Sequence, residues 1–157
     1  MSTYMIKSTL DRLRKRLQEI QKEKYDVAKD LKEAASFGDF SENAEYDAAK
    51  EKKEMLAIEE LRIREWLSDV QLIEEMKLPE DVVTVGKKVR LKDLESGEEI
   101  SFAILGEHDR WEGEDVVSVT SPLARAIMNK KKGRSVEVKL PRSQKRYKIL
   151  EISKLFE

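Results

Sequence analysis

Apolar residues recur along the first part of the chain at alternating spacings of three and four residues. This heptad stripe is typical of a helix that packs along its whole length against another helix. It consists of Leu10, Leu13, Leu17, Ile20, Lys24, Val27, Leu31 and Ala34. Only Lys24 is polar in this set, and no Gly or Pro occurs before Gly38. Because nothing breaks the pattern, the sequence predicts one long helix.

A second helical segment follows a short turn, with apolar residues at strict seven-residue intervals. These are Ala49, Leu56, Ile63 and Val70, supported by Tyr46 and Leu67. Lys53 and Glu60 occupy the seam positions between them. A short connection between two such helices favours an antiparallel pair within one chain. We therefore expect a helical hairpin whose turn lies about 45 Å from its base, at about 1.5 Å per residue.

The pattern changes at Pro79, which lacks a backbone donor and disfavours helix in the preceding residue. Beyond it, β-branched residues and period-two alternation predict strands. The predicted strands span residues 82–85, 88–94, 99–105, 116–119, 135–140 and 147–152. Residues 121–128 predict a short helix, with Ser121 as N-cap and Pro122 at the first helical position.

This division predicts an α+β protein with two domains. We expect an antiparallel coiled-coil hairpin in residues 1–76, with an acidic tip at 38–46, and a β-rich domain in residues 80–157.

Composition excludes several function classes. Charged residues make up 40% of the chain but are nearly balanced, 31 basic against 32 acidic, which argues against broad electrostatic binding to nucleic acid. No cysteine is present, so disulfides, thiolate catalysis and cysteine-ligated zinc are excluded. The first residues lack the apolar core of a signal peptide, and no stretch approaches about 18 consecutive apolar residues. We expect a soluble, cytoplasmic protein that does not bind membranes.

The turn of the hairpin carries an unusual concentration of carboxylates: Asp39, Glu42, Glu45 and Asp47. On the residues alone, helix capping is the favoured interpretation, because Asp39 and Glu42 have the spacing of a capping box. Ser41 or Asn43 could supply the cap instead. The alternative is a metal or catalytic role, since paired carboxylates are hard-oxygen ligands suited to Mg²⁺. Two exposed ligands would hold that ion weakly, so a second molecule would have to complete the site.

Two separated segments carry a family resemblance. The tip closely resembles that of the bacterial Gre transcript cleavage factors. The resemblance covers Gly38-Asp39-Phe40-Ser41-Glu42-Asn43-Ala44-Glu45-Tyr46, continued by Asp47-Ala48-Ala49-Lys50-Glu51. Its downstream half is similar to the GreA type, and the preceding Ala34-Ala35-Ser36-Phe37 is more similar to the GreB type. Thr120-Ser121-Pro122-Leu123-Ala124-Arg125-Ala126 extends the similarity, as does the layout of a coiled coil followed by a β-rich domain resembling the FKBP fold.

The resemblance implies a function in transcription elongation. Gre factors bind bacterial RNA polymerase through the second domain and insert the hairpin into its secondary channel. The tip acids then help to hold a Mg²⁺ ion shared with the polymerase active site, and the backtracked polymerase hydrolyses the nascent RNA near its 3′ end. The factor is thus not an enzyme itself; it activates a hydrolytic activity of the polymerase and binds no cofactor independently. We also expect a monomer.

Residue roles are implied by the same match. Asp39 and Glu42 correspond to the catalytic acids and metal ligands, while Ser41, Asn43 and Tyr46 lie in the same motif and are expected to shape the tip or contact the polymerase. Ser121, Pro122, Leu123 and Arg125 correspond to the polymerase-binding segment.

The tip departs from its relatives in one respect. Related tips often carry an arginine shortly before the Gly-Asp pair or directly after the Asp, where this chain has Ala35 and Phe40. This difference bears on contact with RNA phosphate and not on the acid pair. Two alternatives stay open: an inhibitory relative that occupies the channel without promoting cleavage, and a coiled-coil adaptor whose tip acids are caps. A prolyl isomerase would rest on fold analogy alone.

Overall fold

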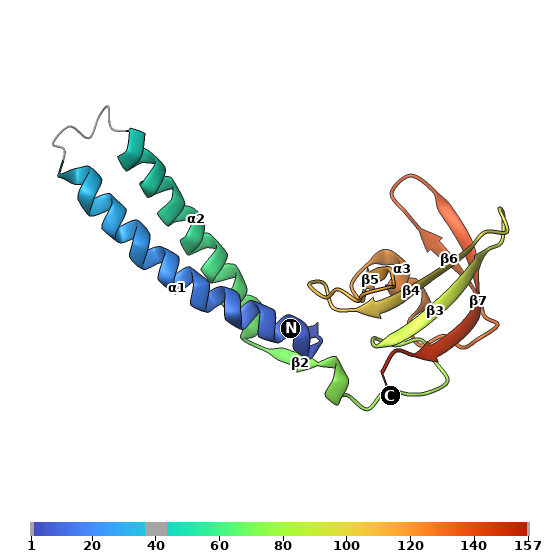
Figure 1. Ribbon diagram of the computed structural model, residues 1–157. Coiled ribbons are helices and arrows are strands. Elements are labelled where there is room, and N and C mark those ends of the chain that lie inside the picture. Colours follow the sequence, from blue (N-terminus) through green and yellow to red (C-terminus); the bar gives the residue numbers. More distant parts are fainter. Residues whose placement is uncertain (1, 37–43, 157) are drawn as a thin grey trace. The chain divides into compact units, whose positions relative to one another are not determined.

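The computed structural model describes residues 2–36 and 44–156. The chain forms two compact units, shown in Figure 1. One unit comprises Leu10–Asp69, and the other combines Met1–Thr9 with Val70–Glu157. The expected hairpin domain, 1–76, therefore differs at both edges from the helical unit, because the first nine residues and residues 70–76 belong with the β-rich part.

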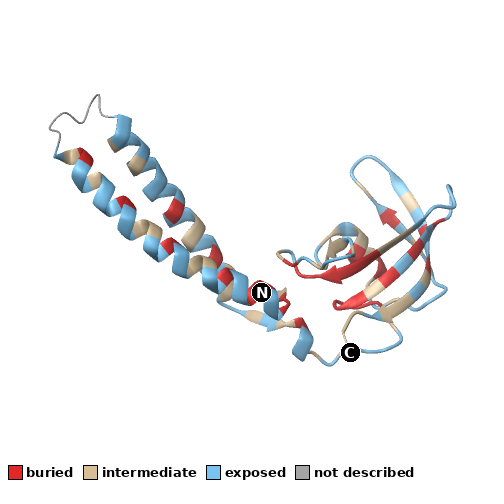
Figure 2. Ribbon diagram, viewed as in Figure 1, coloured by how far each residue is buried: buried red, intermediate tan, exposed pale blue. Residues whose placement is uncertain are grey.

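The helical unit is an antiparallel pair of long helices, α1 (Lys7–Ala35) and α2 (Ala44–Leu67) (Figure 1). The predicted seam is confirmed: Leu10, Leu13, Ile20, Val27 and Ala34 of α1 are buried, as are Leu56 and Ile63 of α2. Figure 2 shows buried positions recurring along both helices between intermediate and exposed ones. Burial of this stripe drives the pairing, since the intrinsic propensity of single helices is weak in water.

Each helix ends at a serine that satisfies its last turn. The N–H and the hydroxyl of Ser36 both donate to the carbonyl of Glu33, and Ser68 does the same with Glu65. Bonds of this three-residue spacing tighten the last turn and occupy carbonyls that would otherwise lack partners.

The second heptad pattern does not extend as far as we predicted. Val70 lies in β2 (Val70–Leu72), which pairs in parallel with β1 (Thr3–Met5). A single 3-10 turn, η1 (Ile73–Glu75), follows. The carboxylate of Glu74 accepts the backbone N–H of Lys7, the first residue of α1, at 2.9 Å. This two-stranded sheet was not predicted.

The β-rich unit is built on a curled five-stranded sheet in the order β5-β4-β3-β7-β6 (Figure 1). Its elements are β3 (Lys87–Asp93), β4 (Glu99–Leu105), β5 (Val116–Ser118), α3 (Pro122–Ile127), β6 (Ser135–Lys139) and β7 (Gln144–Lys154). Neighbouring strands are antiparallel except β4 and β5, which are parallel. The main core lies between this sheet and α3, and includes Val89, Leu91, Ile104, Ile127 and Ile149.

Five of the six predicted strands are confirmed within a few residues, but the strand at 82–85 is wrong. Val83 and Val85 are buried as a strand would require. However, the backbone of Val83 exchanges hydrogen bonds with the loop at Asn129 and Lys130, and not with a strand of the sheet. The segment therefore has the composition of a strand without a ladder to join. No helix within the described residues is both long and apolar enough to cross a membrane.

Candidate functional site

The acidic tip predicted at 38–46 lies largely outside the described residues. This applies to Asp39, Ser41, Glu42 and Asn43, so their roles as catalytic acids, metal ligands, caps or tip-shaping residues stay predictions. The structure describes the two helix ends that carry this segment, Ala35 at the end of α1 and Ala44 at the start of α2.

The first turn of α2 begins the described part of the tip motif. Tyr46 is half-buried there, while Glu45 and Asp47 are exposed. Carboxylates in the first turn are stabilised by the partial positive charge of a helix N-terminus, so both have a structural role independent of any ligand.

A groove of about 450 Å³ runs between the helices near these ends. It is lined by Val27, Asp30, Glu33, Ala34, Glu45, Ala48, Ala49 and Lys52. Three carboxylates and one lysine give it a net negative charge, and its alanines allow the two backbones to approach closely. Within the residues that the structure describes, no group of three or more acidic or histidine side chains is arranged to hold a metal ion. The groove therefore supplies an anionic flank beside the two helix ends.

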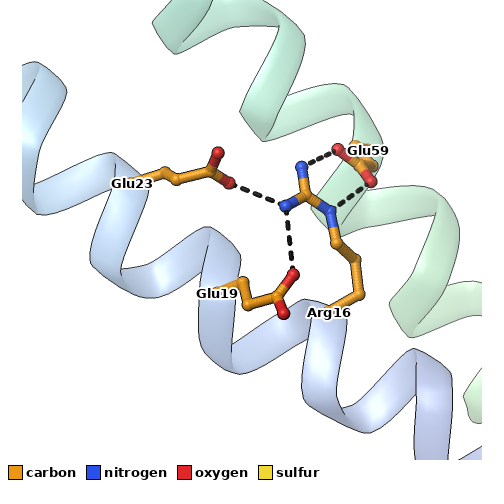
Figure 3. A network of polar contacts seen from close by, with 4 residues as sticks. All are labelled: Arg16, Glu19, Glu23 and Glu59. Atoms are coloured by element: carbon orange, nitrogen blue, oxygen red, sulfur yellow. Dashed lines mark hydrogen bonds and ion pairs between the residues drawn. The ribbon is translucent and has the colours of Figure 1, made fainter.

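Further along the hairpin, Arg16 of α1 forms the network shown in Figure 3. Its guanidinium donates to both carboxylate oxygens of Glu59 on α2, each at 2.7 Å, and to Glu23 at 2.8 Å, with Glu19 at 3.5 Å. The hydrogen bonds with Glu59 raise the pKa of Arg16 above its ordinary value. Donation from Arg16 in turn lowers the pKa of Glu59. The heptad pattern alone does not indicate this cross-helix network.

Two of the three polar residues at seam positions, Lys24 and Glu60, contact each other. Lys24 of α1 donates to Glu60 of α2 at 3.0 Å, and Arg64 donates to the same carboxylate at 3.2 Å. The bond from Lys24, followed by that from Arg64, lowers the pKa of Glu60. Each residue had been visible in the sequence as a seam defect, but their pairing required the register of the hairpin.

The predicted polymerase-binding segment lies on α3 in the β-rich unit. Ser121 is the N-cap, as predicted: its Oγ accepts the backbone N–H of Ala124 at 3.2 Å, and Pro122 is the first helical residue. Leu123 packs on the main core, whereas Arg125 is exposed. A groove of about 440 Å³ beside α3 is lined by Arg125, Met128 and Leu78 among others. The segment thus combines structural positions with one exposed cation, and its partner stays a prediction.

Comparisons with known proteins cover both units. A family model described as "Transcription elongation factor, N-terminal" matches residues 3–71, and one described as "Transcription elongation factor, GreA/GreB, C-term" matches residues 78–154. The chain is 35% identical to the transcription elongation factor GreA of Anaeromyxobacter sp. (strain K), over 95% of this chain and 90% of that protein. It is 39% identical to GreA of Clostridium acetobutylicum, over 81% and 80% of the two chains. A solved structure of GreA factor homolog 1 (Gfh1) of Thermus thermophilus is 21% identical, with a TM-score of 0.45, over 97% of this chain and 99% of that one.

Proposed function

Because the chain belongs to the GreA/GreB family of transcription elongation factors, we propose that it stimulates RNA cleavage by backtracked bacterial RNA polymerase. The observation that carries the proposal is the position of the acid pair. Asp39 and Glu42 lie between the end of α1 and the start of α2, in a chain whose two parts both match the family.

The hairpin supplies reach. A helix of 29 residues extends about 43 Å, at about 1.5 Å per residue. Two helices packed along a largely apolar seam make a stiff support for the segment between them. A few side chains on such a support are enough for catalysis only if the partner supplies the remainder of the active site. In our proposal that partner is the polymerase, whose secondary channel admits the hairpin and whose RNA 3′ end lies within reach.

The acid pair defines what the tip contributes chemically. Carboxylates are the hard-oxygen donors that Mg²⁺ prefers, but two of them leave most of an octahedral shell open. In two-metal hydrolysis, paired ions stabilise the attacking and leaving oxygens of the phosphodiester. Asp39 and Glu42 would act as ligands for a shared Mg²⁺ and orient the attacking water, with the polymerase providing the other ligands.

The flank of the tip supports a cation-dependent mechanism. Asp30, Glu33 and Glu45 line the groove between the helix ends, with Lys52 as its one basic residue. An anionic flank repels RNA phosphates, and Ala35 and Phe40 provide no arginine to offset that repulsion. Activity should therefore depend strongly on the divalent cation.

The test uses halted, backtracked elongation complexes with labelled RNA. Wild-type protein should produce Mg²⁺-dependent cleavage, while Asp39→Asn and Glu42→Gln should lose nearly all of it and still bind polymerase. Asp47→Asn is the matched control, because it removes one exposed carboxylate from the same motif and should retain cleavage.

Three outcomes would change the proposal. Unchanged cleavage by both tip variants would remove the catalytic assignment. Stronger pausing without cleavage by the wild type would indicate an inhibitor that occupies the channel. Loss of helix content, with a stability cost of about 0.5–2 kcal/mol in the same variants, would instead support the capping interpretation.

A further inference from the structure

The apolar seam of the hairpin does not by itself define one alignment of the two helices. Its members repeat at heptad intervals on both helices, so a slip of α2 along α1 replaces one apolar contact by another. Of the polar seam residues, Lys53 is exposed, while Lys24 and Glu60 break this equivalence. The side chain of Glu60 is only 17% exposed and that of Lys24 is 40% exposed, and they meet at 3.0 Å. A slip would separate them and leave a poorly solvated carboxylate without its cross-helix partner.

A second cross-helix pair acts in the opposite axial direction. Arg16 reaches Glu59 through a two-point contact (Figure 3), whereas Lys24 reaches the adjacent residue, Glu60. Arg16 and Lys24 lie eight residues apart, about 12 Å along α1, while their acceptors are about 1.5 Å apart along α2. The two cations therefore approach the same level of α2 from opposite directions, and sliding either way lengthens one of the contacts.

We propose that Arg16–Glu59 and Lys24–Glu60 are positioning pairs that fix the axial register of the hairpin. The register decides how Ala35 and Ala44 are aligned, and therefore where the segment bearing Asp39 and Glu42 is held. A slip of one heptad, the interval at which the apolar contacts repeat, would displace one helix end by about 10 Å relative to the other. The consequence for cleavage rests on the proposed function, but the register itself can be measured without polymerase.

The absence of cysteine makes a distance measurement clean. Lys32→Cys on α1 and Lys50→Cys on α2, both exposed positions near the tip-side ends, would carry spin labels for pulsed electron resonance on the full chain. In the doubly labelled protein with no further change, we expect one narrow distribution of the distance between the two labels. Lys24→Glu and Glu60→Lys should each broaden it or shift it by about 10 Å, the length of one heptad. The exchange of both residues should restore it, because Arg64 is 57% exposed and can turn to water. Lys22→Glu, the same charge change at an exposed position of α1, should leave the distribution unchanged.

A second variant separates register from stability. Replacing both Lys24 and Glu60 by leucine should raise the melting temperature, since the carboxylate of Glu60, 17% exposed, then no longer has to be desolvated. The same variant should nevertheless broaden the distance distribution, because the seam then lacks the ion pair that distinguishes one alignment from the next. Circular dichroism confirms that each variant is helical.

Wild-type distributions in both charge-reversal variants and in the leucine variant would overturn the inference, as would failure of the double exchange to restore the distance. In the cleavage assay, the single reversals should reduce cleavage and the exchange should recover it. If the wild type fails to stimulate cleavage, the proposed function fails, while the distance result still decides the register.

Discussion

The carboxylate of Asp109 accepts the backbone N–H of Ile6 at 3.1 Å, across 103 residues of sequence. Its second oxygen accepts the N–H of Gly106 at 2.8 Å. Asp109 is 7% exposed and Ile6 is 3% exposed, so both bonds are shielded from water. A single buried side chain thus ties the N-terminal segment to the loop after β4, within the unit that contains both.

Removing this carboxylate should destabilise the β-rich unit. Asp109→Ala leaves two buried N–H groups without an acceptor, and each unsatisfied group costs about 1–3 kcal/mol. Asp109→Asn should lower the free energy of unfolding by less, because its side-chain amide oxygen can still accept one of the two backbone N–H groups. Urea unfolding followed by Trp111 fluorescence, in a Trp66→Phe background, reports on this unit. Asp115→Ala, at an exposed position, is the control; equal midpoints for Asp109→Ala and Asp115→Ala would contradict the assignment.

The contrast between Asp109 and the heptad stripe shows what sequence patterns can reveal. The hairpin was predictable because its signal is local: each seam residue lies three or four positions from the next. Asp109 has no such signal, since its partner is 103 residues away and its neighbours Glu107 and Arg110 indicate only an exposed loop. The pairing of β1 with β2 was missed for the same reason. Three-residue strands show no period, and Val70 continues the heptad spacing while lying in a strand.

The candidate site divides in a similar way. Ser121 and Pro122 were predictable as a helix start because capping depends on adjacent residues. Lys24 and Glu60 were recognisable as polar seam positions, but which residue faces which is a property of two helices together. The acid pair was suggested by motif resemblance, and its arrangement lies outside the described residues.

Close packing at Gly106 gives a second stability prediction. A Cβ atom at this position would overlap the carbonyl oxygen of Tyr4 and lie 2.9 Å from a carboxylate oxygen of Asp109. Because the first obstacle is backbone, Gly106→Ala should cost about 1–3 kcal/mol or more, as overpacked cores do. Gly97→Ala is the comparison: its φ of 77° is strained for alanine, but nothing lies within 4 Å. In urea titrations Gly106→Ala should lose more stability than Gly97→Ala, and the reverse order would show that Tyr4 can move aside.

Arg125 offers a test of the predicted polymerase-binding segment. Its side chain is exposed on α3, so Arg125→Ala should change the free energy of unfolding by no more than about 0.5 kcal/mol. If the segment binds polymerase with Arg125 as an energetic hot spot, a role in which arginine is enriched, the same change should weaken binding about tenfold or more. Arg142→Ala removes an exposed arginine from the turn between β6 and β7 and should bind normally. Ser121→Ala is expected to differ from both by losing about 0.5–2 kcal/mol of stability through its missing cap. Titration of labelled protein with polymerase, alongside thermal unfolding, measures both effects.

The Arg16–Glu59 pair predicts a pH dependence of the hairpin. Donation from Arg16 holds the pKa of Glu59 below its ordinary value. A carboxyl with a lowered pKa in the folded state contributes stability above its unfolded pKa, about 4.3, and loses it as the pH falls through the folded value. Arg16→Met should therefore be less stable than wild type at neutral pH, by about 1 kcal/mol or less for a pair this exposed. The difference should shrink as the solution is acidified below pH 4.3 or so.

Urea unfolding followed by the helix signal in circular dichroism, at neutral pH and in acid, measures this difference in stability between Arg16→Met and the wild type. Arg14→Met removes an exposed arginine from the same helix and should differ from wild type by the same small amount at both pH values. Added salt should reduce the Arg16 effect at neutral pH, since a partly exposed pair is screened. An Arg16→Met deficit that stays constant between neutral and acidic solution would assign the effect to the packing of the arginine stem along the seam, and not to the ion pair.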